Sequence, residues 1–246
     1  MASHPSLSGP ICVIGRGRMG SALAAALRER GAVVDGPLGR GATGRGASIV
    51  LLCVPDRAIA DAAALVERGP VVGHASASAP LDLLAPHERF SLHPLLSVVG
   101  AGASFDGAYC AIEGSGPAGI AAARALAALL GMHAAAIPPD KRALYHAAAS
   151  AASNFLITVE GMAERLAELV GLERAALAPL VRATVENWAR QGARAALTGP
   201  IARGDLVTAA RQRGAVAEAA PDLLPLWDAL AAETRELARP SATDAA

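Results

Sequence analysis

The sequence predicts an α/β protein that consists of an N-terminal, doubly wound Rossmann domain and a C-terminal, all-helical domain. Three observations lead to this fold class. A glycine-rich turn at residues 15–20 joins an apolar run to a helix-forming run, and short apolar runs then alternate with helical segments as far as residue 137. From residue 141 onward the pattern is helical throughout, so we expect the domains to comprise residues 1–137 and 138–246.

The glycine-rich turn has the spacing of a dinucleotide-binding loop. Residues 11–14 are all apolar and predict a buried strand, which runs without a linker into Gly15, Gly17 and Gly20. Gly15 permits the tight turn, Gly17 has no Cβ to block an approaching pyrophosphate, and Gly20 lets the next helix lie close to the strand. The alternative is a structural turn in a domain that binds no nucleotide.

The predicted helix at residues 21–30 would present unpaired N–H groups and the positive end of its dipole to the phosphates. We therefore expect Arg18 and Met19, which lie between the second and third glycines, to bind the cofactor together with the glycines.

The end of the second predicted strand, residues 31–35, bears on the choice of cofactor. Asp35 stands where an acidic residue would bind the ribose 2′-hydroxyl of NAD. A glycine-rich loop with Arg40 and Arg45 follows at once, and an arginine just beyond this strand is what a 2′-phosphate needs. We favour NADP over NAD, with an ordinary solvated loop arginine as the alternative for Arg40.

Two further strand ends supply candidate binding residues. Residues 48–54 read as a strand buried on both faces, and Pro55 ends it, so we expect Val54 and Pro55 at the cofactor's edge. The strand at residues 71–73 runs into a polar turn that contains His74 and Ser76. Because the carboxyl ends of such strands point at the ligand crevice, both are site candidates. The alternative is that His74 and Ser76 are merely the polar residues of a turn and that Ser78 caps the next helix.

His93 and Pro94 form another strand-to-loop transition, after the apolar residues 90–92. A histidine can donate to a substrate oxygen or shuttle a proton near pH 7, so His93 is a catalytic candidate, with a purely structural histidine as the alternative.

The first long helix of the second domain has two patterned faces. Between residues 144 and 169 apolar residues recur at spacings of three and four and form a continuous stripe. His146, Ser150 and Asn154 follow one another at i, i+4 and i+8 and predict a polar column on another face. No residue from 143 to 159 is charged, so we expect both faces to be covered, one by the core and one by a site or a partner subunit. Hydrogen bonds at a dimer seam are the alternative for the column.

Residues 197–205 combine turn formers with polar side chains and predict a shaped loop. Thr198 and Arg203 are its candidate substrate-binding residues, because an arginine is the natural partner of a substrate carboxylate.

The composition disfavours several other classes of function. The net charge is zero, and only seven of the 246 residues are aromatic, so we expect no nucleic-acid partner. No window of eighteen apolar residues exists, and the N-terminus lacks a secretion signal. The three cysteines lie in apolar runs and indicate reduced thiols. We therefore expect a cytoplasmic protein with no membrane partner and no metal.

Four of these motifs together resemble a known group, the Rossmann-like and DUF2520 domain-containing proteins. The motifs are the glycine fingerprint at residues 15–20, the His93-Pro94 pair, and the runs at residues 145–154 and 197–205. The resemblance spans nearly the whole chain. It implies a Rossmann domain followed by a helical domain like that of 6-phosphogluconate dehydrogenase. The wider relatives are ketopantoate reductases, pyrroline-5-carboxylate reductases, prephenate dehydrogenases and β-hydroxyacid dehydrogenases.

The resemblance also has consequences for the site. Related β-hydroxyacid dehydrogenases place a lysine and an asparagine on the helix that faces the nicotinamide, whereas His146, Ser150 and Asn154 occupy the matching turns here. The resemblance implies a homodimer formed through the helical domain, and it makes 2-dehydropantoate a candidate substrate. The group usually has a glycine where Ala77 stands and a histidine near Gln212, and both changes put the family's site geometry in doubt.

These observations predict an NADP-dependent reductase of a small 2-oxo acid or imine acid. His146 or His93 would donate the proton, Ser150 and Asn154 would hold substrate oxygens, and Arg203 would bind a carboxylate. A dimeric nicotinamide-nucleotide sensor without chemistry is the main alternative. A methyltransferase is a weaker one, since those enzymes also use a glycine loop after a first strand.

Overall fold

The computed structural model describes residues 9–240, and contacts between residues divide the chain into two compact units between Ser153 and Asn154. The first unit contains all seven strands, in the order β1 (Ile11–Ile14), β2 (Val34–Leu38), β3 (Ile49–Leu52), β4 (Val71–His74), β5 (Arg89–Pro94), β6 (Tyr109–Gly114) and β7 (His133–Ala136). They form one sheet with the spatial order β2-β1-β3-β4-β5-β6-β7. All neighbouring pairs are parallel except β5 and β6.

Both faces of this sheet are buried, as a doubly wound fold requires. Side chains alternate along β1: Ile11 and Val13 join one apolar cluster, whereas Cys12 and Ile14 join the other. The first cluster also takes residues from α1 (Arg18–Glu29) and α3 (Pro117–Leu129), and the second takes residues from α2 (Ile59–Leu65). The Rossmann architecture predicted from the alternating pattern is therefore confirmed.

The remaining elements of the first unit are short helical turns and the start of a long helix. The 3-10 turns are η1 (Asp56–Ala58), η2 (Leu81–Leu84) and η3 (Pro139–Lys141), and α4 (Arg142–Ser150) follows the last of them. The last strand ends at Ala136, one residue before the predicted end of the strands at residue 137, but residues 138–153 belong to the first unit by their contacts. They include Arg142 and Tyr145, whose side chains reach strand residues far away in the sequence.

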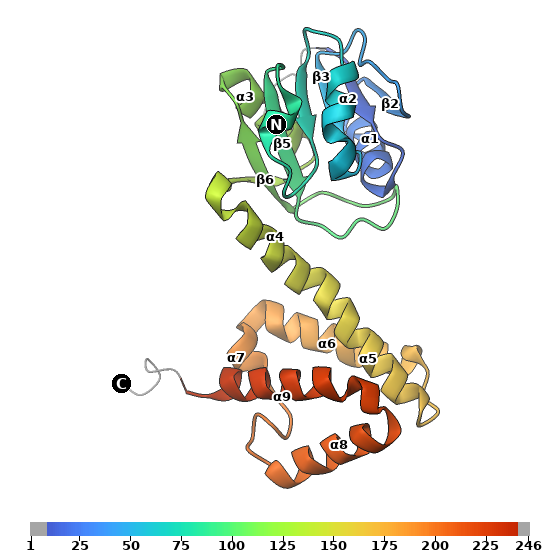
Figure 1. The fold of residues 1–246 in the computed structure, drawn as a ribbon, viewed down its shortest axis with the longest axis vertical. Helices are drawn as coiled ribbons and strands as arrows, with labels where there is room; N and C mark the ends of the chain where they lie inside the picture. The colour runs from blue at the N-terminus through green and yellow to red at the C-terminus, as the bar shows by residue number, and fades with distance from the viewer. Residues whose placement is uncertain (1–8, 241–246) are drawn as a thin grey trace. The chain divides into compact units, whose positions relative to one another are not determined.

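The second unit is entirely helical, as expected. A π-helical turn, η4 (Ala151–Phe155), leads into α5 (Leu156–Glu168), so the chain stays helical from residue 142 to residue 168 (Figure 1). The other helices are α6 (Arg174–Gln191), α7 (Ala193–Ala196), α8 (Leu206–Ala219), the 3-10 turn η5 (Pro221–Leu223) and α9 (Leu224–Ala238). A small core of Met162, Val216, Ala220 and Leu223 holds α5, α8 and η5 together. No helix among residues 9–240 is long and apolar enough to cross a membrane.

Candidate functional site

The glycine loop has the geometry that its sequence predicts. Gly15 has a φ of +128°, and a Cβ there would overlap the carbonyl of Cys53. A Cβ on Gly20 would overlap the carbonyl oxygen of Gly15, so the start of α1 lies directly against the turn. At Gly17, by contrast, a Cβ would meet no atom within 4 Å, and among residues 9–240 no side chain caps the helix. The start of α1 therefore has open space at Gly17 and no side-chain cap within the described chain, as a phosphate-binding loop needs.

Backbone hydrogen bonds join the ends of the first four strands of the sheet. The amide of Gly15 donates to the carbonyl of Leu38 at 2.8 Å, and that of Cys53 donates to Ile14 at 2.7 Å. The amide of Ala75 donates to Leu52 at 3.1 Å. The loops that follow β1, β3 and β4 are thus held together at the carboxyl edge of the parallel strands, where such sheets bind ligands.

A cavity of about 220 Å³ opens at this edge. Its wall contains the first turn of α1, the loops after β3 and β4, and one side chain each from β5 and α4. The lining residues are Met19, Cys53, Val54, Asp56, Ala75, Ser76, Ala77, Ser78, His93 and His146. Met19, Val54, Ser76, His93 and His146 were all expected from the sequence to lie at the site, and the structure brings them to one cavity.

Asp56 forms the acidic side of the cavity, and two serines bind its carboxylate. The hydroxyls of Ser76 and Ser78 both donate to Asp56 Oδ2, at 2.9 and 3.0 Å. Ser76 Oγ also accepts from the amides of Ser78 and Ala79. It is therefore Ser76, and not Ser78, that satisfies the amides of this turn. These bonds fix the loop after β4 against the loop after β3 and leave Asp56 Oδ1 without a partner among residues 9–240.

Tyr145 on α4 forms a hydrogen bond with the ring of His93. Its Nδ1 lies 2.8 Å from the hydroxyl of Tyr145, and the two rings meet edge to face with centroids 5.6 Å apart. The ring of His146 is a further neighbour, with its centroid 6.4 Å from that of His93. Two imidazoles and a phenol thus meet beside the cavity, and His93 and His146 both line it.

The environment sets the protonation of these groups. Burial, and then the charges of His146 and Arg142, lower the pKa of His93 from 6.5 to about 4. Burial also raises the pKa of the Tyr145 phenol. Near pH 7 His93 is a neutral imidazole and Tyr145 a protonated phenol, so the pair can relay a proton by exchanging tautomers. Burial raises the pKa of Cys53 to about 12, which leaves this lining residue a thiol and not a nucleophile.

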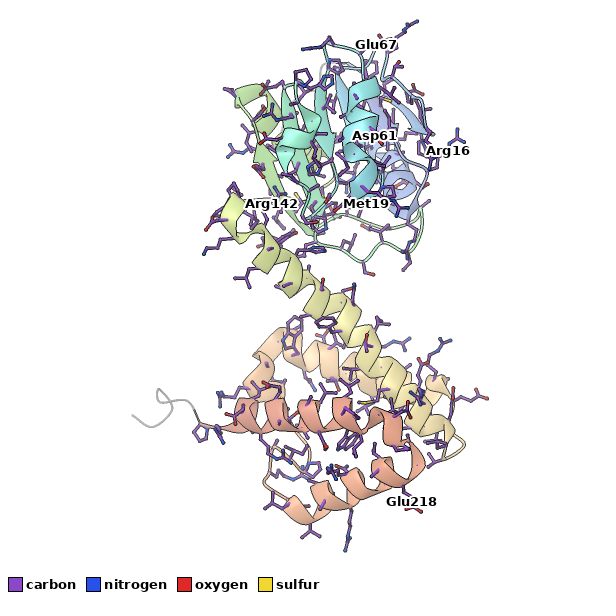
Figure 2. All side chains as sticks on the ribbon, in the orientation of Figure 1. Arg16, Met19, Asp61, Glu67, Arg142 and Glu218 are labelled. Atoms are coloured by element: carbon purple, nitrogen blue, oxygen red, sulfur yellow. The ribbon has the colours of Figure 1, made fainter. Side chains whose placement is uncertain are left out.

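Below the cavity, a buried arginine fastens α4 to the sheet. Arg142 is 6% exposed, and its guanidinium donates to Glu113 on β6, to Ser91 Oγ on β5 at 2.8 Å and to the carbonyl of Ala77 at 3.4 Å. Glu113 and Ser91 are register partners across β5 and β6. Figure 2 marks Arg142 at the start of α4 and Met19 at the start of α1. The network orients the helix that carries Tyr145 and His146.

His74 continues the same row of polar residues on the next strand. It is fully buried at the end of β4, pairs in register with Ser91, and accepts a hydrogen bond from the amide of Ser76 through Nδ1 at 3.2 Å. Its Nε2 has no partner among residues 9–240. Burial and the charge of Arg142 lower its pKa from 6.5 to about 4. His74 therefore supports the wall of the cavity from behind and does not line it.

The residues expected to bind the adenosine lie at the end of β2. This strand ends at Leu38, three residues later than the sequence predicted, because its pairing with β1 continues to Ile14. Asp35 lies within the strand and pairs with Cys12, so it does not stand at the strand end. Arg40 follows the strand and is exposed, as an arginine that meets a phosphate should be. Pro55 is likewise exposed at the end of the loop after β3.

The polar column predicted on the long helix is only partly present. His146 lines the cavity, whereas Ser150 and Asn154 do not. The π-helical turn begins directly after Ser150, and its wider turn rotates Asn154 away from the line that α-helical spacing predicts. Asn154 is also the first residue of the second unit. Its carbonyl accepts a hydrogen bond from the hydroxyl of Thr158, four residues on.

Thr198 and Arg203 lie in the second unit, on the shaped loop that the sequence predicted. Backbone bonds from Arg203 to Gly199 and from Asp205 to Pro200 close this loop, and the carboxylate of Asp205 caps α8 by accepting from the amide of Thr208 at 3.0 Å. Both candidates are exposed, and Arg203 forms no ion pair within residues 9–240.

Three site residues were not singled out from the sequence: Asp56, Tyr145 and Arg142. Asp56 follows the strand-ending Pro55, so the rule that strand ends face the ligand applied to it as well. Arg142 and Tyr145 share one helix face at i and i+3, a pattern that can be seen in the sequence. Their partners on β5 and β6 lie about fifty and thirty residues away, and local patterns do not reveal such pairs.

Comparison with solved structures shows the same fold in several oxidoreductases. A proposed NADP oxidoreductase from Bacteroides fragilis is 20% identical, with a TM-score of 0.79, over 93% of this chain and 98% of that one. Plasmodium falciparum pyrroline carboxylate reductase with NADP bound is 10% identical, with a TM-score of 0.61, over 94% and 99%. A reductive aminase from Aspergillus terreus with NADPH and ethyl-5-oxohexanoate is 17% identical, with a TM-score of 0.66, over 93% and 94%. These likenesses show a shared fold.

The sequence itself places the chain in a family. No curated protein matches it. The family model described as "Domain of unknown function (DUF2520)" matches residues 108–234, which is more than half of the chain. The match runs from β6 through most of α9 and includes His146, Thr198 and Arg203. As its motifs predicted, the chain belongs to the DUF2520 family.

Proposed function

We propose that this protein is an NADP-dependent oxidoreductase that reduces a small 2-oxo acid or imine acid. One observation carries the proposal: the first turn of α1, directly after the glycine loop, lines the same cavity as His93 and His146. A dinucleotide bound on the loop would thus have its reactive end beside groups that can handle a proton. The solved structures of the same fold that contain NADP or NADPH support the choice of chemistry.

The residues present fit a dinucleotide. Gly15 and Gly20 hold the turn against α1, the space at Gly17 is open, and Arg18 is the first residue of α1, whose start has no side-chain cap. Val54 and Ser76 lie where the loops after β3 and β4 border the cavity. When bound, the nicotinamide would supply the hydride, and the protein would supply binding, orientation and the proton.

The proton would come from the group around His93. His93 is neutral near pH 7, so it would donate the proton of a ring N–H to the substrate and take a proton from the hydroxyl of Tyr145. His146 lies beside His93 and is the alternative proton donor. We retain Ser150 and Asn154 as candidates for holding substrate oxygens. Thr198 and Arg203 remain the candidates for binding a substrate carboxylate, since Arg203 is exposed and unpaired in the described part of the chain. 2-Dehydropantoate is a candidate substrate on the family resemblance.

The test is a screen of NADPH oxidation against 2-oxo acids and cyclic imines, with wild type, His93→Ala, His146→Ala and Tyr145→Phe. Replacing the residue that donates the proton should lower kcat by about a hundredfold and leave the affinity for NADPH unchanged. Tyr145→Phe should lower kcat less than His93→Ala if the phenol acts through the imidazole. Calorimetry that registers no heat from NADP, NADPH, NAD or NADH at millimolar ligand would refute the proposal.

A nicotinamide-nucleotide sensor without chemistry is the second candidate, and one observation favours it. The chain has a single lysine, Lys141, and this side chain is exposed and pairs with Asp140, away from the cavity. The lysine-based proton transfer that the family resemblance would suggest is therefore absent at the cavity. Tight binding of NADPH without turnover across the whole panel would support the sensor and exclude the reductase.

We further propose that the protein is a cytoplasmic homodimer that assembles through its helical unit. All three cysteines are free, which suits a reducing compartment. Within the described chain α6 contains no buried residue, and Leu180 and Trp188 on it are 66% and 55% exposed. A helix with exposed apolar side chains and no fully buried residue in its own chain can gain stability from a partner, and a second copy of the same helix is the simplest one.

A further inference from the structure

The carboxylate of Asp56 binds a neighbouring loop and not its own helical turn. Asp56 is the first residue of η1, a position where an acidic side chain usually interacts with the free backbone amides of the turn. No backbone amide of residues 9–240 donates to it. The two hydrogen bonds that Asp56 Oδ2 accepts come from the hydroxyls of Ser76 and Ser78, on the loop after β4. Asp56 is therefore oriented by the wall of the cavity, and its turn does not use its charge.

No lysine or arginine of the described chain neutralises this carboxylate. Asp56 forms no ion pair within residues 9–240, although Arg57 follows it in the sequence. The ten side chains that line the cavity include neither a lysine nor an arginine. The guanidinium of Arg142, below the cavity, is bound to Glu113. The cavity thus has one carboxylate in its wall and no lysine or arginine to balance it.

The charge of Asp56 acts on a histidine that is a candidate proton donor. Burial and the charges of His146 and Arg142 lower the pKa of His93 to about 4, whereas the charge of Asp56 acts in the opposite direction. Asp56 and His93 are therefore close enough to interact, and both line the cavity. Because His93 is neutral near pH 7, it does not offset the negative charge of Asp56.

A free carboxylate oxygen beside a proton donor suits one kind of substrate. Asp56 Oδ1 has no hydrogen-bond partner among residues 9–240, and an ionised carboxylate can only accept hydrogen bonds. A protonated imine offers both a positive charge and an N–H donor. A 2-oxo acid offers neither, and Asp56 would repel the negative charge that develops on its oxygen during reduction.

We infer that Asp56 binds the protonated nitrogen of the substrate and so makes an imine acid, and not a 2-oxo acid, the substrate of this site. This inference rests on the proposed function and decides between the two substrate classes named there. His93 or His146 would protonate the imine nitrogen, and Asp56 Oδ1 would accept a hydrogen bond from the resulting N–H. When a hydride adds to the carbon, the electron pair of the C=N bond returns to nitrogen and leaves a neutral amine.

The first test compares ligands that differ only at one ring atom. We would titrate the protein in saturating NADP with racemic proline and pipecolate, whose ring nitrogens are positively charged. The matched ligands are tetrahydrofuran-2-carboxylate and tetrahydropyran-2-carboxylate, which carry an oxygen in that place. By calorimetry, wild type should bind at least one ring amine about tenfold or more tightly than the ring ether of the same size. Equal affinities, or no binding of either ring amine, would overturn the inference.

The variant Asp56→Asn tests the charge itself. It keeps an oxygen that can accept from the hydroxyls of Ser76 and Ser78, so the loops should stay joined. The preference for ring amines should disappear, and kcat/KM for cyclic imines should fall about tenfold or more. The control Asp61→Asn removes an exposed carboxylate from α2 (Figure 2) and should change neither quantity. A preference for ring amines that survives in Asp56→Asn would contradict the assigned role.

A milder variant tests how the carboxylate is held. Ser78→Ala removes one of the two hydroxyls on Asp56 Oδ2 and leaves the bond from Ser76, together with the bonds that Ser76 Oγ accepts from the backbone. It should reduce the preference for ring amines, but less than Asp56→Asn does. A reduction as large as that of Asp56→Asn would show that the loop and not the charge sets the preference.

The substrate screen separates this inference from the proposed function. Reduction of 2-oxo acids but of no cyclic imine by wild type would overturn the inference and leave the proposed reductase intact. Binding of NADPH without turnover of any compound would overturn the proposed function, and the inference with it.

Discussion

At the scale of single residues, two glycines of the same loop are needed for different physical reasons. Gly15 has a positive φ, and a Cβ there would overlap the carbonyl of Cys53, so the fold itself requires glycine. Gly17 has an extended backbone as the N-cap of α1, and a Cβ there would meet only open space. The fold therefore tolerates a side chain at Gly17, and only a bound ligand would not.

Two alanine variants separate these reasons. Gly17→Ala should unfold at the same urea concentration as wild type but weaken NADPH binding about tenfold or more, because its Cβ points into the space that the pyrophosphate needs. Gly15→Ala should lose roughly 2 kcal/mol or more of the free energy of unfolding through backbone strain and overlap. Urea titrations and calorimetry measure both. Unchanged nucleotide affinity in Gly17→Ala would contradict the assigned binding loop.

Burial lowers the pKa of both His74 and His93 to about 4, so both should make the stability of the protein sensitive to acid, and His74 is the fully buried one. Its pKa is about 4 in the folded protein and 6.5 in the unfolded chain, so between these values the unfolded chain binds a proton that the folded protein does not. The free energy of unfolding should therefore fall as the pH drops from about 6.5 to 4, by up to roughly 3 kcal/mol from this fully buried residue. Urea titrations at pH 7, 5.5 and 4.5 measure the slope.

The variant His74→Asn isolates this contribution. An asparagine can keep an acceptor for the amide of Ser76 but does not titrate, so the acid slope should flatten even if the absolute stability falls. The matched control is His133→Asn, which replaces an exposed histidine on the edge strand β7. A slope that stays the same in His74→Asn would show that other groups cause the acid sensitivity.

At the scale of elements, α4 is held to the sheet by one buried charge. Arg142→Gln would leave the carboxylate of Glu113 without its cation in a mostly buried place, and removing one partner of such a pair costs about 3 kcal/mol or more. The first unit should therefore unfold at lower urea concentration. Adding Glu113→Gln should recover part of the loss, since the orphaned charge disappears. Strict additivity of the two single losses would contradict this coupling.

Local sequence patterns predicted most elements but not all of their ends. The strand at residues 11–14 and the helix over residues 206–219 lie where the apolar spacing indicated. The end of β2 differs from its prediction, and the helix that carries the polar column is interrupted, for tertiary reasons. Pairing with β1 carries β2 on to Leu38 in spite of Gly36 and Pro37, which read as a turn, and the π-helical turn after Ser150 breaks the spacing on which the column depended.

At the scale of the whole molecule, α6 is the helix through which we propose that two copies of the chain assemble. All of its residues are at least partly accessible in the single chain, although it carries Leu180, Val185 and Trp188. If the proposed homodimer covers this helix, Trp188→Glu should bury a charge at the interface and shift the protein toward monomer.

Sedimentation velocity at micromolar concentration measures the fraction of monomer in wild type and in the variant. Arg124→Glu on the exposed surface of α3 is the control, and a wild-type monomer would refute the proposed assembly.

The amino-acid sequence by itself determined the fold class, the family and the glycine loop, because each motif behind them is a spacing within about ten residues along the chain. Only the tertiary structure decided how the cavity is built. It joined Asp56 to Ser76 and Ser78, His93 to Tyr145, and Arg142 to Glu113, pairs separated by twenty to more than fifty residues. Such pairs form where strand ends and one helix meet at the edge of a sheet. The order of the strands decides which residues lie at that edge, and local spacing in the sequence does not encode this order.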